Sequence, residues 1–347
     1  MTPSYVLSFC EHQHVPRVMA FIDRYFRVGH PLSRRRDLFD WQYGNGSHGR
    51  YNIVLAVEPS SAEILGMLGY IDSTRYDPAL AADNCAWLTM WQVKAEARIP
   101  SLGLALVRYL QEHVEHRFLA SSGIRAALKP MYRALRFEVR DLTHHFLLNP
   151  TVREHRIAVI PPGVPTSWPV ASSGLRLSRL SIANFSLETS ATPTSVARTP
   201  RKSALYFYHR YTCHPFYAYL VFLVKRGSTP AGLLAARIVS ENGARALRVV
   251  DVLLDAKDLP ELGAPLLELI VDQECEYGDF LQAGLDATGL SSSGFRTVTG
   301  EPGVIVPNHF EPYVRENVRI TACYRGPDQG SFVVCKGDCD QDRPNLL

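Results

Sequence analysis

The first 150 residues of the chain show two hydrophobic periods. Apolar residues at every second position are typical of strands, and apolar residues three or four positions apart are typical of helices. The pattern predicts a strand at Tyr5–Phe9 and helices over residues 14–30 and 33–45. A hairpin is expected next, because two β-rich runs flank the turn-forming residues Pro59–Ser61. The predicted order continues as strand, helix, strand, helix and strand over residues 85–93, 102–116, 118–124, 127–137 and 138–149.

The second half of the chain repeats this order of elements. The spacing supports the repeat, since 44 residues separate Val93 from Phe137 and 43 separate Val252 from Phe295. Because repeated units bury similar cores, the pattern favours a duplicated domain. The matching elements are two hairpin strands, a strand, a helix and a strand, at residues 216–227, 231–243, 246–254, 259–278 and 279–285.

A change in composition separates the two halves. Six prolines are spread among many Ser and Thr residues between positions 161 and 200, which is typical of a connecting segment. Residues 173–188 within it keep an apolar alternation that would suit an added edge strand. We therefore predict an α/β protein with two tandem domains, each a central mixed sheet flanked by helices. The predicted boundaries are a first domain at 1–160, a connection at 161–200 and a second domain at 201–347.

Charge and composition exclude several classes of protein. The net charge of +3 is too small to indicate a nucleic-acid-binding surface. No apolar stretch approaches the roughly 18 residues of a membrane span, and the N-terminus lacks the pattern of a signal peptide, so a cytoplasmic protein without membrane insertion is expected. The seven cysteines lack the paired spacings of a zinc site. Reduced thiols and no bound metal are therefore expected.

The clearest chemical signal lies where a strand runs into a helix, in residues 91–110. The turn contains Arg98, Ser101 and Gly103, and the backbone N–H groups at the start of the helix lack intrahelical partners. Such a helix start attracts anions, and small residues let a phosphate approach the backbone. Arg98 can add a charge-assisted hydrogen bond. The alternative is an ordinary strand-to-helix turn in which the glycine serves packing.

This segment resembles the acyl-CoA-binding motif of the GCN5-related N-acetyltransferase family. That motif has Arg or Gln, two residues, Gly, one residue, and Gly or Ala; Ser101 takes the place of its first glycine. The resemblance extends over residues 1–150, where Tyr132 and Phe137 match a tyrosine and a phenylalanine of the family and Arg136 replaces the usual glycine. It implies acetyl-CoA or another acyl-CoA as co-substrate, no metal, and Tyr132 as the acid that protonates the leaving thiolate. The cofactor-binding residues that it implies are Trp91, Gln92, Val93, Arg98, Ile99, Ser101, Leu102, Gly103 and Leu104.

A basic and aromatic segment, residues 29–45, lies where the family places the helices that cover the acceptor. Arg35, Trp41 and Tyr43 combine cations with aromatic rings, as binding of a nucleotide-linked sugar requires, although a solvated basic helix face is the alternative. Together with residues 340–345, this segment is similar to acetyltransferase-like proteins of bacterial surface-polysaccharide gene clusters. The similarity supplies the hypothesis of a nucleotide-activated amino sugar as acceptor. The general base is left open among His30, Asp40, Glu96, His144 and His145.

The second copy is predicted to have lost its cofactor site. Asp255, Asp258 and Glu261 occupy the turn where phosphates would lie, and carboxylates repel phosphates. Leu290 stands where the tyrosine would be. We expect this half to shape the acceptor cleft or to hold an oligomer such as a homodimer.

The sequence thus predicts an acyl-CoA-dependent N-acyltransferase of polysaccharide biosynthesis. One alternative is a scaffold in which neither copy is catalytic. Another is a Fem-type aminoacyl-tRNA-dependent transferase, which the near-neutral charge and the absence of a long helical insertion disfavour. Asp338, Asp340 and Asp342 alternate near the C-terminus, where we favour a structural tail over a divalent-cation site.

Overall fold

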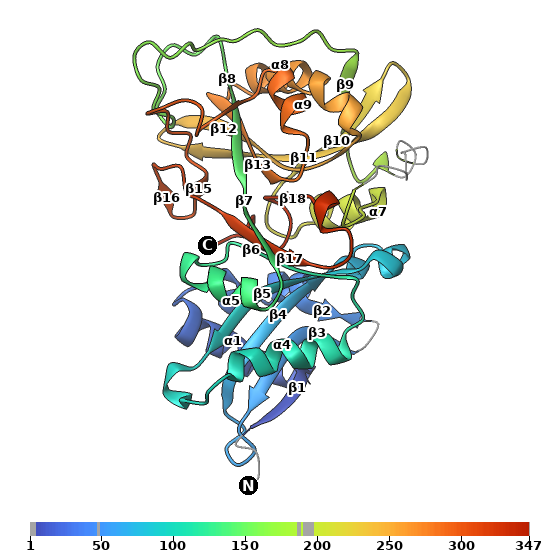
Figure 1. Ribbon diagram of the computed structural model, residues 1–347, viewed down its shortest axis with the longest axis vertical. Coiled ribbons are helices and arrows are strands. Elements are labelled where there is room, and N and C mark those ends of the chain that lie inside the picture. The colour runs from blue at the N-terminus through green and yellow to red at the C-terminus, as the bar shows by residue number, and fades with distance from the viewer. Residues whose placement is uncertain (1–4, 47–48, 186–188, 190–197, 347) are drawn as a thin grey trace.

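Two eight-stranded sheets lie end to end along the molecule, each flanked by helices (Figure 1). The computed structural model describes residues 5–46, 49–185, 189 and 198–346. A third sheet consists of two short strands, β15 (His309–Phe310) and β16 (Tyr313–Val314). None of the described helices combines the length and the apolar character that crossing a membrane requires.

The first sheet has the strand order β1-β3-β4-β5-β6-β17-β7, with β2 beside β3. Only β5 and β6 are parallel neighbours, and helix α4 connects them. Leu102, Leu106 and Leu110 on one face of α4 pack into the core against the sheet, as the helical spacing predicts. The strands are β1 (Val6–Cys10), β2 (Gly44–Asn45), β3 (Arg50–Val57), β4 (Ile64–Asp72), β5 (Cys85–Val93), β6 (Phe118–Ser122), β7 (Glu138–Asp141) and β17 (Thr321–Arg325). The helices are α1 (Val15–Phe21), which continues into a π-helical segment (Ile22–Phe26), α2 (Pro31–Arg34), α3 (Arg36–Tyr43), α4 (Leu102–His113) and α5 (Lys129–Ala134).

The second sheet has the matching order β9-β10-β11-β12-β13-β8-β14, with β18 beside β13. Its edge strand β9 comes from the Pro-rich stretch, in the part where apolar alternation suited an edge strand. The strands are β8 (Thr143–Leu148), β9 (Leu175–Leu180), β10 (Leu220–Arg226), β11 (Thr229–Glu241), β12 (Ala244–Leu254), β13 (Tyr277–Ala283), β14 (Arg296–Thr297) and β18 (Val334–Cys335). The helices are α7 (Ala204–Phe207), which also continues into a π-helical segment (Tyr208–Thr212), α8 (Gly263–Asp272) and α9 (Ala287–Ser292).

The two halves exchange one strand each. β17, from the C-terminal part of the chain, lies between β6 and β7, where Cys323 faces Ser121 on one side and Val139 on the other. In return, β8 lies between β13 and β14 of the second sheet. Each sheet therefore contains a strand from the other half of the sequence, and the proposed domain ranges stay a prediction.

This exchange corrects one sequence-based prediction. Residues 138–149 were expected to form a single strand, but the structure divides them into β7 and β8, which belong to different sheets. The break lies at Leu142, a buried residue whose N–H donates to Ile320 O at 2.8 Å. Residues 138–149 contain neither Gly nor Pro, so the sequence gives no turn signal at the break.

Candidate active site

The parallel pairing of β5 with β6 ends at Trp87 and Ala120, and the two strands part beyond this point. Met90 lies at φ +42° in an irregular stretch of β5, where the register with β4 shifts. A pocket of about 330 Å³ opens between the separated strands. It is lined from β5 and β6, from the turn and helix after β6, from Phe26, and from the C-terminal tail.

Four of the residues predicted to form the site line this pocket, namely Trp91, Gln92, Val93 and Tyr132. The Tyr132 side chain is buried and its ring meets that of Trp91 edge-on, with 6.1 Å between centroids. Burial raises the pKa of Tyr132 well above its usual value, although Ser121 opposes the shift. A phenol is protonated at neutral pH with or without this shift, as a proton donor has to be.

The predicted phosphate-binding turn lies outside the lining of the pocket but directly beside Trp91. A β-carbon on Gly103 would come within 3.2 Å of Trp91 Nε1, so glycine at this position allows the close packing. Arg98 and Ser101 adopt left-handed backbone angles, with φ +47° and +59°. Each such non-glycine residue costs on the order of 1–3 kcal/mol, so the surrounding structure has to hold this turn in place. The other predicted residues of this turn are Ile99, which is half-buried, and Leu102 and Leu104, which lie in the first turn of α4.

Arg98 is exposed at the start of this turn. Within the described ranges its guanidinium has no hydrogen-bond or ion-pair partner, in contrast to the nearby Lys94, which pairs with Glu63. An unpaired guanidinium beside a helix N-terminus is free to bind an anion.

The residues predicted to contact the acceptor lie in different surroundings, and none of them lines the pocket. Tyr43 is buried, and its hydroxyl lies 3.0 Å from Oγ1 of Thr89, a pocket residue. Trp41 packs against His214 of the second half, with 4.3 Å between ring centroids. Arg35 donates two hydrogen bonds to the Asp37 carboxylate, one from Nε and one from Nη2.

None of the five candidate bases lines the pocket. His144 and His145 belong to β8 in the second sheet, where they contact Asp279 and Gln282. Burial lowers the pKa of His30 to about 3, and its Nδ1 accepts a hydrogen bond from Leu32 N–H. The remaining two are Asp40, which pairs with Arg36, and Glu96, which is exposed.

The C-terminal tail also lines the pocket, although the sequence-based prediction did not include it in the site. Asp340, Gln341 and Arg343 line it. Gln341 Nε2 donates to Ser122 O of β6 at 3.0 Å, so the tail is attached to the strand beside the pocket. The sequence offered the alternating aspartates and the resemblance of residues 340–345 as signals, and neither indicates which half of the molecule the tail contacts.

The corresponding opening in the second half is filled by the chain itself. β12 and β13 pair in parallel as far as Val249 and Phe280. Beyond this point β18 pairs with β13, Lys336 N–H donates to Leu281 O, and Gly337 N–H donates to Val250 O of β12. The tail therefore satisfies the backbone groups that an extended ligand would use. The acidic turn predicts that the second half does not bind the cofactor phosphates. The tail gives a second, steric reason, because it occupies the opening.

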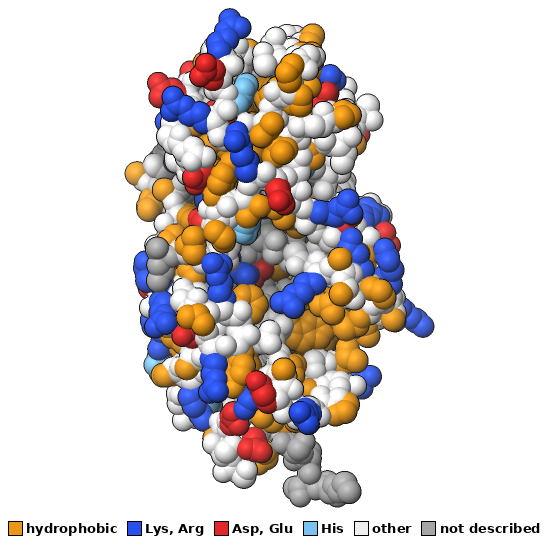
Figure 2. Space-filling view, turned by 90° about the vertical axis from the view of Figure 1, so that its left-hand side faces the viewer, with side chains coloured by type: hydrophobic (Ala, Val, Ile, Leu, Met, Phe, Trp, Pro, Cys, Tyr) orange, Lys and Arg blue, Asp and Glu red, His pale blue; other side chains and the backbone are white. Residues whose placement is uncertain are grey.

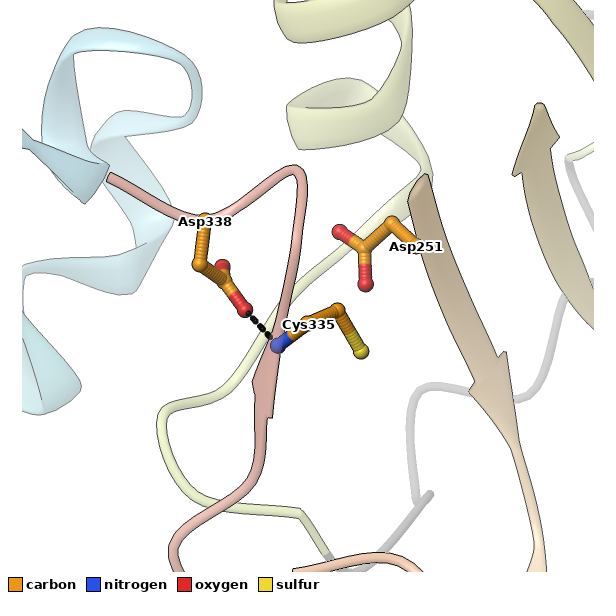
Figure 3. Close-up of side chains that lie close together, drawn as sticks. All are labelled: Asp251, Cys335 and Asp338. Atoms are coloured by element: carbon orange, nitrogen blue, oxygen red, sulfur yellow. Dashed lines mark hydrogen bonds between the residues drawn. The ribbon is translucent and has the colours of Figure 1, made fainter. Parts of the chain in front are cut away.

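Three side chains at this filled opening, Asp251, Cys335 and Asp338, lie close enough together to bind a metal ion (Figure 3). The positive charge next to these carboxylates comes from Lys202, whose ammonium lies 2.5 Å from Asp251 and 2.6 Å from Asp338. Arg198 pairs with both carboxylates as well. Two buried cations thus balance the two carboxylates.

All seven cysteines are free thiols.

The surface charges are mixed. Figure 2 shows basic and acidic side chains interspersed over the face that it draws, with hydrophobic side chains gathered in the lower half.

No protein-family model matches the sequence, and no curated protein matches it. Solved structures do match. A GCN5-related N-acetyltransferase from Anabaena variabilis covers 92% of this chain and 72% of its own, with a TM-score of 0.56 and 10% identity. A conserved protein of unknown function from Enterococcus faecalis, described as a probable N-acyltransferase, covers 92% and 71%, with a TM-score of 0.55 and 9% identity. The chain therefore has the α/β fold of two tandem GCN5-related N-acetyltransferase-like domains, as the sequence predicted.

Proposed function

We propose that this protein is an acyl-CoA-dependent N-acyltransferase whose first half alone is catalytic. The observation that carries the proposal is the open pocket between β5 and β6, with Tyr132 in its wall and the turn at Arg98 beside it. The backbone of Trp91–Val93 would pair with the pantetheine arm, as an added strand does. The Arg98–Leu104 turn would hold the pyrophosphate. Transfer would be a direct attack of a neutral amine on the thioester, with Tyr132 protonating the departing thiolate.

The acceptor is proposed to be a small molecule with an amino group. The sequence-based hypothesis of a nucleotide-linked amino sugar, and of a role in surface-polysaccharide biosynthesis, is retained as the finer proposal. It rests on the resemblance of residues 29–45 and 340–345, because Arg35, Trp41 and Tyr43 lie outside the lining of the pocket. A cytoplasmic location would give the enzyme access to both acyl-CoA and nucleotide sugars.

Calorimetric titration with acetyl-CoA tests the proposal. We expect one molecule bound per chain, because the opening in the second half is filled by β18. No binding would favour the non-catalytic scaffold, and two molecules per chain would mean that the tail leaves the second opening.

The substitution Arg98→Glu is expected to weaken acetyl-CoA binding by roughly 10- to 100-fold, since a hydrogen bond to a charged group contributes about 1.5–3 kcal/mol. Arg108→Glu is the matched control, because Arg108 is also exposed but lies on the second turn of α4. Equal loss in both variants would indicate a general charge effect, and unchanged affinity in Arg98→Glu would place the phosphates elsewhere.

The substitution Tyr132→Phe is expected to lower kcat by about 100-fold or more while leaving acetyl-CoA affinity nearly unchanged, because it removes only the proton donor. Release of free CoA thiol measures the rate. Tyr109→Phe serves as the control, since Tyr109 stacks on His113 and does not line the pocket. An unaltered kcat in Tyr132→Phe would remove Tyr132 from the reaction.

A further inference from the structure

The pocket of the first half has a single carboxylate in its lining. Among the described residues that line it, Asp340 is the only acidic side chain, and the lining contains no histidine. Asp340 is buried and forms an ion pair with Arg343, a second lining residue. The one carboxylate among the described lining residues that can accept a proton from an amine therefore comes from the C-terminal tail.

The tail is anchored firmly on both sides of Asp340. Before it, Arg210 donates to Gly337 O at 3.0 Å and to Cys339 O at 2.6 Å. The Cys339 thiol donates to Leu88 O, at the point where β5 leaves β6. These contacts fix the backbone that leads to Asp340.

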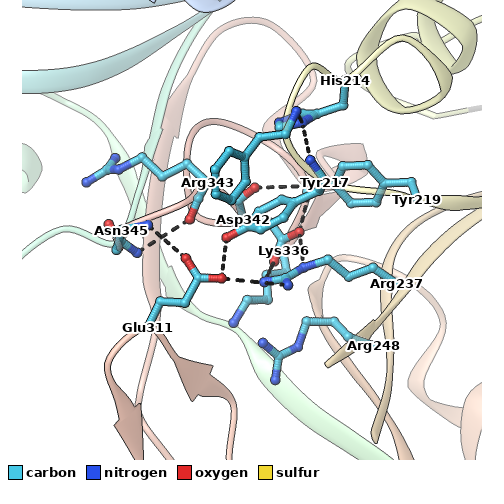
Figure 4. Close-up of polar contacts among 12 residues, drawn as sticks. His214, Tyr217, Tyr219, Arg237, Arg248, Glu311, Lys336, Asp342, Arg343 and Asn345 are labelled. Atoms are coloured by element: carbon cyan, nitrogen blue, oxygen red, sulfur yellow. Dashed lines mark hydrogen bonds and ion pairs between the residues drawn. The ribbon is translucent and has the colours of Figure 1, made fainter. Parts of the chain in front are cut away.

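After Asp340, a buried polar cluster holds the tail on the second half (Figure 4). Asp342 accepts hydrogen bonds from Arg237 at 2.8 Å and from the Tyr219 hydroxyl at 2.7 Å. Glu311 accepts from Asn345 N–H at 2.9 Å. A catalytic group needs such support, because an error of about 1 Å in its position can cost a large part of its effect.

The three alternating aspartates of the tail thus have different roles. Asp338 and Asp342 are bound by buried cations of the second half, Lys202 and Arg237. Asp340 lies between them and lines the pocket of the first half. The anchoring of Asp338 and Asp342 explains how a residue from one half reaches the site of the other.

We propose that Asp340 binds the ammonium group of the acceptor and accepts its proton, so that the acceptor is a small primary amine that arrives protonated. This inference rests on the proposed function. The carboxylate already pairs with Arg343, so the ammonium would share it with that guanidinium, and burial leaves little water to screen either pair. The apolar lining, which includes Phe26, Leu88 and Met131, suits the carbon skeleton next to that amine.

The protons of the transfer are all accounted for. The ammonium gives one proton to the Asp340 carboxylate, which later releases it to water. The neutral amine nitrogen then attacks the thioester carbon, forming the C–N bond, and the C–S bond breaks as the intermediate collapses. Tyr132 gives its proton to the thiolate and regains one from the nitrogen. The products are the amide, CoA thiol and one proton in water.

The test compares acceptors that differ in protonation. Glucosamine and ethanolamine are mostly protonated near pH 7, whereas hydroxylamine is mostly neutral and needs no base before it attacks. In Asp340→Asn we expect kcat/KM for the two protonated amines to fall by about 100-fold or more. Hydroxylamine acetylation and acetyl-CoA affinity should change by less than about 3-fold, which a general loss of structure would not allow.

A carboxylate elsewhere in the C-terminal segment provides the control. The Asp328 side chain is 74% exposed and lies outside the pocket, so Asp328→Asn should leave all rates unchanged. If Asp340→Asn does not fold, the double variant Asp340→Asn/Arg343→Gln removes both charges of the ion pair and is measured in the same way.

Each outcome separates the two proposals. If the wild-type protein does not bind acetyl-CoA, the proposed function fails and the role of Asp340 fails with it. If it binds acetyl-CoA and acetylates hydroxylamine but neither protonated amine, the acceptor class is wrong. If it acetylates the protonated amines and Asp340→Asn does so equally well, or loses hydroxylamine activity to the same extent, the role of Asp340 is wrong while the acyltransferase proposal stands.

Discussion

Residues 1–160 expressed alone are expected to form no stable, cooperatively folded unit. They lack β17, which pairs with both β6 and β7, so two strands lose their shared neighbour. They also carry β8 without the second sheet, which exposes the apolar side chains of Phe146, Leu147 and Leu148. Exposed strand edges with apolar residues promote aggregation. Circular dichroism and size-exclusion chromatography would show little cooperative unfolding and large aggregates.

Co-expression of residues 1–160 with residues 161–347 should restore a folded complex, because each fragment supplies the strand that the other lacks. A sharper control joins residues 1–141 through a Gly/Ser linker to residues 318–346, which provides β17 and omits β8. This chain should be more soluble than residues 1–160. Cooperative unfolding of residues 1–160 alone would show that β17 is dispensable and that the first half does not need the strand exchange for its stability.

Local sequence patterns were sufficient to predict most of the elements. The spacing of Leu102, Leu106 and Leu110 predicts α4, because one face of this helix has to be apolar to cover a sheet. The repeat of the same order of elements in the second half could be predicted for the same reason, because its strands and helices also follow the apolar spacing of their type. The exchange of β8 and β17 was not, since an apolar strand has the same pattern whichever sheet it joins.

The site was predicted in part. Trp91–Val93 and Tyr132 line the pocket, and they lie within one continuous stretch of the sequence whose motif resembles a known family. Asp340 entered the sequence analysis as one of three alternating aspartates and as part of residues 340–345, but not as a site residue. More than 200 residues separate it from Tyr132, and its position depends on Arg210 and Arg237, which are distant in sequence from both. A contact of this kind is determined by the assembled fold rather than by local spacing.

Lys202 stabilises the part of the tail that fills the opening in the second half. Its buried ammonium joins Asp251 to Asp338, and so ties the tail to β12. Burial alone would raise the pKa of Asp251, but Lys202 and Arg198 hold it below its usual value. The carboxylate therefore stabilises the fold above the pKa of an unfolded aspartate, about 4, and this contribution is lost as the pH falls further.

The substitution Lys202→Met should lower the free energy of unfolding at pH 7 by about 3–5 kcal/mol, because it leaves two buried carboxylates with Arg198 as their remaining cation in the cluster. Urea titration measures the loss. In Lys257→Met, which removes an exposed ammonium 3.9 Å from Asp255, the change should be at most about 1 kcal/mol. The difference between wild type and Lys202→Met should shrink below about pH 4, where the Asp251 carboxyl becomes protonated and no longer needs a cation. A loss that is the same at every pH would mean that Lys202 stabilises the tail by packing and not by charge.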